Sequence, residues 1–198
     1  MEISGESLPH VFGANELLEF GNHPDYKNKK VIVIGGGNVA IDVARVSNRM
    51  GAKEVTIVYR RAKEQMPAEK IEVEEAEREG VKFLFQVNLK KIDNNEVHLM
   101  KTELIKKEGE QRPIPVDVPK SEFTLNADYV IMAIGSKLDK QETDLELNER
   151  GYIKVDENYK TNLPNVYACG DCIGEKATVA WASKSGRAVA EKIIMEQN

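Results

Sequence analysis

Residues 31 to 45 read Val-Ile-Val-Ile-Gly-Gly-Gly-Asn-Val-Ala-Ile-Asp-Val-Ala-Arg. Four consecutive β-branched residues lead into a glycine cluster, and small apolar residues then recur at helical spacing. This order predicts a buried strand, a tight turn and a helix. The pattern Gly35-x-Gly37-x-x-Ala40 matches the G-x-G-x-x-G/A pattern of dinucleotide-binding βαβ units. We therefore expect an α/β fold with a Rossmann-like parallel sheet.

Each position of this pattern has a mechanical reason. Gly35 permits a sharp turn, and Gly37 lacks the Cβ that would keep a pyrophosphate away. Ala40 lets the helix pack closely on the strand. The first amide N–H groups of the helix would point at the anion, where the helix dipole favours negative charge. The predicted cofactor-binding turn therefore consists of Gly35, Gly36, Gly37, Asn38, Val39 and Ala40. An ordinary strand–helix turn is the alternative interpretation.

Basic residues at the end of the next expected strand, residues 55 to 59, indicate which dinucleotide binds. An NAD-binding unit places Asp or Glu about 20 residues past the glycines, on the ribose 2′-hydroxyl. Here Arg60 and Arg61 follow Tyr59 instead, with Lys63 nearby. A guanidinium matches a 2′-phosphate with a fork of donors, whereas a carboxylate would repel it. The sequence thus predicts NADPH, with a solvated basic loop as the alternative.

The rest of the chain alternates between helical and strand patterns. We expect a helix starting near Asn15, which would cap it, and an antiparallel meander between residues 86 and 123. Gly135 ends a buried strand, and Asp171 follows a short apolar strand. The remaining expected elements are a helix over 38–50, a helix from Met66-Pro67 to Glu79, a parallel strand over 81–85, strands over 127–135 and 166–168, and a closing helix over 177–197.

Composition narrows the classes of partner and site. The net charge is −5 over 198 residues without a long basic run, which argues against nucleic acid and anionic membranes as partners. No apolar run approaches the roughly 20 residues of a membrane span, and no signal-peptide pattern opens the sequence. The two cysteines are too few for a disulfide-stapled fold. We expect a cytoplasmic protein without a metal site.

Taken together, the motifs resemble the pyridine nucleotide-disulfide oxidoreductase superfamily. They are most similar to the small (beta) subunits of NADPH-dependent glutamate synthases. The residues that carry the likeness are 31–45, Val58-Tyr-Arg-Arg61, Met66-Pro-Ala68, Tyr129 to Gly135, Thr161 to Asp171, and the closing Gly174, Thr178 and Gly186-Arg187.

The resemblance implies two nested nucleotide domains. Residues 28–138 would form the NADPH-binding Rossmann-like domain, and residues 1–27 and 139–198 would be incomplete FAD-binding segments. By resemblance, Gly135, Gly170 and Asp171 would bind cofactor, with Asp171 on the flavin's ribityl or pyrophosphate region. Ala177, Thr178 and Val179 would lie near the flavin ring. In this family NADPH gives a hydride to FAD, and electrons pass on through iron–sulfur clusters.

Two departures from the family set limits on this interpretation. The family's FAD site needs an upstream glycine-rich βαβ unit, and its iron–sulfur segment is rich in cysteine; the sequence shows neither. We therefore expect a C-terminal fragment of a larger flavoprotein, whose partner is an upstream FAD/iron–sulfur region or a separate subunit, and which self-associates as a homo-oligomer. Two alternatives stay open: a non-catalytic nucleotide-binding module, and a thioredoxin-reductase-like dithiol enzyme using Cys169 and Cys172.

Overall fold

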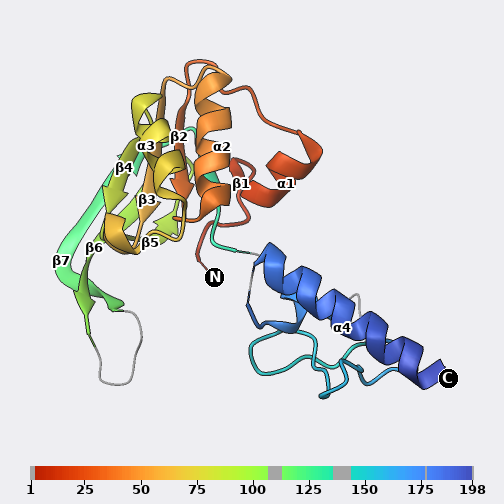
Figure 1. Cartoon of the computed structure of the whole chain (residues 1–198). Helices are drawn as coiled ribbons and strands as arrows, with labels where there is room; N and C mark the ends of the chain where they lie inside the picture. Colours follow the sequence, from red (N-terminus) through yellow and green to blue (C-terminus); the bar gives the residue numbers. More distant parts are fainter. Residues whose placement is uncertain (1–2, 107–112, 136–143, 177, 198) are drawn as a thin grey trace. The chain divides into compact units, whose positions relative to one another are not determined.

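The computed structural model describes residues 3–106, 113–135, 144–176 and 178–197 (Figure 1). Contacts divide it into two compact units, Met1–Ile134 and Gly135–Asn198.

The first unit is built on a five-stranded parallel sheet with the strand order β1-β8-β2-β3-β4. β2 and β3 are buried along almost their whole length because both faces of the sheet are covered, and such strands read as continuous apolar runs. The prediction of a Rossmann-like parallel sheet is confirmed. The strands are β1 (Val11–Gly13), β2 (Lys30–Ile34), β3 (Glu54–Tyr59), β4 (Lys82–Phe85) and β8 (Tyr129–Met132).

One face of this sheet is covered by helices and the other by a second sheet (Figure 1). The helices are α1 (Ala14–Phe20), α2 (Asn38–Arg49) and α3 (Lys70–Arg78). The second sheet is antiparallel, in the order β5-β6-β7, which confirms the predicted meander. Its strands are β5 (Val87–Ile92), β6 (Glu96–Ile105) and β7 (Ile114–Asn126).

The N-terminal elements belong to the sheet of the first unit. β1 pairs with β8, and α1 follows it directly. The N-cap of α1 is Gly13, in extended conformation, so the predicted cap at Asn15 is wrong. The helix begins earlier because β1 runs straight into it. The assignment of residues 1–27 to an FAD-binding segment is not tested by this packing and stays a prediction.

The helix predicted from Met66-Pro67 begins later than expected. A short 3₁₀ turn, η1 (Lys63–Gln65), comes first, and α3 starts at Lys70 after the extended residue Glu69. The reason is tertiary. The N–H of Ala68 donates to the carbonyl of Gly36 at 3.2 Å, and the N–H of Glu69 donates to Asn38 Oδ1 at 2.9 Å. These bonds hold residues 66 to 69 extended against the glycine turn.

The second unit contains a 3₁₀ turn, η2 (Gly170–Ile173), and the long helix α4 (Val179–Gln197). The strand predicted over 166–168 is wrong: the described residues there make only an isolated bridge between Lys160 and Tyr167. Since parallel strands need neighbours on a sheet, and the described part of this unit contains none, the segment has nothing to join. The closing helix is confirmed over Val179–Gln197, and Ala177, where it was predicted to begin, lies outside the described residues.

The described residues lack two kinds of feature, a membrane-spanning helix and a metal-binding cluster. None of their helices is both long enough and apolar enough to pass through a bilayer. Nor do they gather three or more His, Cys, Asp or Glu side chains in a geometry that could hold a metal ion.

Candidate functional site

The glycine turn lies at the carboxyl end of β2, the edge at which open parallel sheets bind ligands. Gly35 has a φ of 149°, and its N–H donates to the carbonyl of Val58 at 3.1 Å. A Cβ added there would lie 2.3 Å from the carbonyl oxygen of Ala133, which follows β8. Gly35 is therefore required by the protein's own packing.

Gly36 is also required by the protein itself, for a different reason. A Cβ at this buried position would lie 2.4 Å from Cδ2 of Tyr59. The ring of Tyr59 thus covers the turn, and its hydroxyl donates to the carbonyl of Gln65 at 2.8 Å. Tyr59 joins the glycine turn to the loop after β3, a role that the sequence analysis did not foresee.

Gly37 differs from its two neighbours. The atom closest to an added Cβ is Cγ of Pro67, at 4.0 Å, and the backbone at φ −92° and ψ 176° is open to any residue. Neither packing nor backbone conformation therefore demands glycine here. The missing side chain therefore leaves open space at this position.

The start of α2 is also available to an anion. Gly37 is the N-cap, and no side chain caps this helix. The carbonyl of Gly37 accepts hydrogen bonds from the N–H groups of Ala40 and Ile41, at 2.9 and 3.3 Å. The amide groups of Asn38 and Val39 come before these, in the helix turn where amides lack intrahelical partners. Ala40 is fully buried, as the close packing of helix on strand requires.

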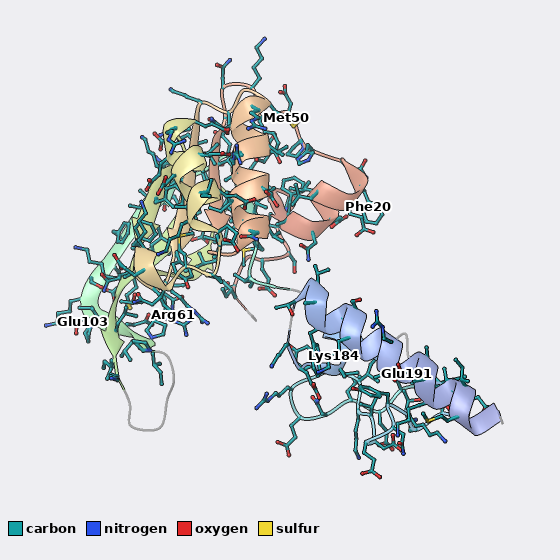
Figure 2. All side chains as sticks on the ribbon, viewed as in Figure 1. Phe20, Met50, Arg61, Glu103, Lys184 and Glu191 are labelled. Atoms are coloured by element: carbon teal, nitrogen blue, oxygen red, sulfur yellow. The ribbon has the colours of Figure 1, made fainter. Side chains whose placement is uncertain are left out.

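Arg60 and Arg61 directly follow β3, the neighbour of β2 in the sheet. Figure 2 shows Arg61 at the end of the unit opposite Met50, which caps the C-terminus of α2. Neither guanidinium pairs with a carboxylate of the described residues, and the buried Nε of Arg61 has no acceptor there. Lys63 in the same loop does pair, with Glu77 at 2.5 Å. The two arginines therefore keep donors for a ligand.

A cavity of about 260 Å³ opens beside the same loop, between η1 and α3. Its walls combine apolar side chains with charged ones of both signs. They are Lys63, Glu64, Met66, Ala68, Lys70, Val73 and Glu74. These residues have the sequence pattern of a helix start, which carries no signal for a cavity.

The residues predicted to bind flavin belong to the second unit. Gly170 is buried with a φ of 75°, and its N–H donates to the buried Ser185 Oγ of α4 at 3.0 Å. Asp171 is exposed, and its carboxylate makes no ion pair within the described part of the chain. Oγ1 of Thr178 accepts the N–H of Trp181 at 3.2 Å at the start of α4. Gly135 is exposed with a φ of 95°, and Ala177 lies outside the described residues.

Cys169 and Cys172 are free, half-buried thiols on either side of Gly170 and Asp171. The thiol of Cys172 donates to the carbonyl of Cys169 at 3.0 Å. The geometry therefore gives the thiol a local structural contact and no catalytic partner among the described residues.

The comparisons with known proteins identify the family of the chain. The family model of the pyridine nucleotide-disulphide oxidoreductases matches residues 2–186. The chain belongs to this family. Among its relatives, the beta subunit of the NADP(+)-dependent formate dehydrogenase of Moorella thermoacetica is 38% identical over 89% of this chain and 26% of its own length. The small chain of the NADPH glutamate synthase of Escherichia coli K12 is 34% identical over 95% of this chain and 44% of its own. The chain thus spans less than half the length of either relative.

Solved structures show the same fold. Mycobacterium tuberculosis FprA in complex with NADPH matches 98% of this chain and 60% of its own, with a TM-score of 0.82 at 20% identity. The thioredoxin reductase of T. acidophilum matches 99% of this chain and 61% of its own, with a TM-score of 0.71 at 23% identity. The α/β class and the family resemblance predicted from the motifs are confirmed.

Proposed function

We propose that this chain is the NADPH-binding portion of an FAD-dependent oxidoreductase similar to the glutamate synthase small subunits. One observation supports this most directly. The only glycine of the turn that packing does not require, Gly37, opens onto an uncapped helix N-terminus. At the end of the neighbouring strand stand two arginines without ion-pair partners among the described residues.

The two halves of the site would take different parts of the nucleotide. The turn from Gly35 to Ala40 would hold the pyrophosphate through backbone amides and the helix dipole. Arg60 and Arg61 would hold the 2′-phosphate by charge-assisted hydrogen bonds. This division explains why the basic residues follow the strand next to the glycine turn.

The flavin would be held by the second unit together with an upstream region. Gly170, Asp171, Ala177, Thr178 and Val179 are the proposed flavin contacts in this chain. Gly135 is proposed as a cofactor-binding residue of the NADPH domain. When bound, NADPH would supply a hydride and FAD would accept it, so the chemistry would belong to the cofactors. The chain's residues need only bind and orient them. In domain terms, we propose an NADPH domain over residues 28–138 and FAD-binding segments over 1–27 and 139–198.

The parent protein would work with other electron carriers. The relatives' names, a beta subunit and a small chain, support a partner subunit for the full-length protein. We propose a cytoplasmic complex and, for this chain alone, self-association through apolar surface such as Val179, which is 89% exposed.

Calorimetry with NADPH and NADH tests the proposal. Each charge-assisted contact to the 2′-phosphate contributes about 1.5–3 kcal/mol, so NADPH should bind about 10- to 100-fold more tightly. Replacing Arg60 and Arg61 together with Ala should remove most of this preference and leave NADH binding unchanged. Arg78→Ala is the matched control, because Arg78 is exposed on α3 and pairs with Glu74. Equal affinities in the unmodified chain would refute the NADPH assignment.

A further inference from the structure

One buried hydroxyl outside the nucleotide site holds the backbone that carries the two arginines. Thr102 lies on β6 of the antiparallel sheet and is only 3% exposed. Its Oγ1 donates to the carbonyl of Arg60 at 2.8 Å, across 42 residues of sequence. A side chain of the antiparallel sheet therefore forms a hydrogen bond with the backbone of the loop after β3.

A second contact joins the same two segments. Gln86 stands between β4 and β5, where the chain passes from one sheet to the other. Its N–H donates to the carbonyl of Arg61 at 3.0 Å, and its carbonyl accepts the N–H of Thr102 at 2.7 Å. Gln86 has a φ of 54°, a conformation costly for a residue with a side chain. Such strain persists where the surroundings fix the backbone, often at functional sites.

The pairing of β6 with β7 changes register next to Thr102. Met100 pairs with Glu122, whereas Thr102 pairs with Asp117. Within the extra residues of β7, Ser121 Oγ accepts the N–H of Lys101 at 3.1 Å. Irregularities of this kind are common beside active sites, where they redirect a side chain. Here the buried hydroxyl that contacts the loop beginning at Arg60 lies directly beside such an irregularity.

We propose that Thr102 is a positioning residue for recognition of the 2′-phosphate, an inference that rests on the proposed NADPH function. The guanidinium groups of Arg60 and Arg61 have no ion-pair partner in the described part of the chain, so their placement depends on the backbone that carries them. Thr102 and Gln86 hold the carbonyls of these two residues. Removing the hydroxyl leaves the Arg60 carbonyl without this partner and loosens the start of the loop. The glycine turn, at a different strand end, is left intact.

Thr102→Val tests this role, since valine keeps the shape of threonine and removes only the hydroxyl. In calorimetry on the full chain, NADPH affinity should fall about five- to tenfold, the equivalent of one hydrogen bond. NADH affinity should stay within about twofold. Thr102→Ser keeps the hydroxyl and should restore the NADPH/NADH ratio. Thr124→Val is the matched control, because Thr124 is an exposed residue of the adjacent strand β7, opposite His98.

A double-mutant cycle separates this inference from the function on which it rests. In a chain that already lacks both arginine side chains, Thr102→Val should not change NADPH affinity further. If the unmodified chain does not prefer NADPH, the proposed function is wrong and the inference falls with it. If it does prefer NADPH and a folded Thr102→Val or Thr102→Ala variant keeps the preference, only the inference is overturned. If neither variant folds, the hydroxyl serves the fold, which also overturns it.

Discussion

Replacing Gly37 with Ala should weaken nucleotide binding at least about tenfold without unfolding the protein. The added Cβ would meet only Cγ of Pro67, at 4.0 Å, and the backbone conformation suits alanine. Alanine at an N-cap costs about 0.5–1 kcal/mol relative to glycine, and the lower entropy of the unfolded chain returns about 0.4–1 kcal/mol. The free energy of unfolding should therefore change by less than about 1 kcal/mol.

Binding should change far more than stability. The methyl group would occupy the space where the pyrophosphate approaches the amides at the start of α2. Losing one or two charge-assisted hydrogen bonds of about 1.5–3 kcal/mol each weakens binding by at least about tenfold. NADPH and NADH should lose affinity alike, since both carry the pyrophosphate. Calorimetry measures the affinities, and urea denaturation followed by circular dichroism measures the stability.

Gly36→Ala is the matched control, one residue away. Its Cβ would lie 2.4 Å from the ring of Tyr59, an overpacking that typically costs about 1–3 kcal/mol of stability. The Gly37→Ala variant should therefore lose nucleotide affinity and keep its stability. The Gly36→Ala variant should instead lose stability first. A Gly37→Ala protein that folds and binds NADPH normally would refute the argument and place the phosphate elsewhere.

Three further predictions concern stability, pH and flavin. Tyr59→Phe should lower the free energy of unfolding by about 1 kcal/mol in urea denaturation, because the carbonyl of Gln65 loses its partner. Hydrogen bonds from Arg45 and then Arg49 lower the pKa of Glu79 to about 2. The stabilisation by Glu79 should therefore be complete above the pKa of the unfolded state, about 4.5, and fade as pH falls toward 2. The Tm difference between the unmodified chain and Glu79→Gln should shrink on acidification. A Tm difference that stays constant with pH would contradict this. Finally, the chain should purify colourless and retain no flavin band after incubation with excess FAD and desalting, because the one glycine turn of this kind in the described residues is assigned to NADPH. About one equivalent of retained FAD would show a complete flavin site.

Local sequence patterns were sufficient for most of the first unit. The apolar runs that became β2 and β3 are buried on both faces, and a strand in that position has few alternatives. The start of α3 could not be predicted in this way. It depends on Ala68 and Glu69 donating to Gly36 and Asn38, about thirty positions earlier in the chain, and no local pattern encodes such a bond.

For the candidate site, the sequence predicted where the glycine turn and the two arginines lie but not which residues support them. The structure brings the glycine turn and the two arginines to the ends of neighbouring strands, as their spacing predicted; their role in binding stays a prediction. Tyr59 and Thr102 carried no signal, since an aromatic residue and a threonine in strands are ordinary core residues. The strand predicted at Val166 failed because an apolar run becomes a strand only beside a partner, and the described part of the second unit offers none.

The loop over residues 60 to 69, which begins with the two arginines, is held in a way that has a consequence for protein engineering. Residues 60 to 69 are fastened by acceptors on Gly36 and Asn38 and by the hydroxyl of Thr102, all outside the loop. Transplanting the loop into a homologous scaffold would carry the charged side chains but leave these attachment points behind. A designer who wants to convert an NADH enzyme by grafting this segment should therefore transfer the attachment points as well, because under the proposed function the cofactor preference would depend on three distant parts of the chain.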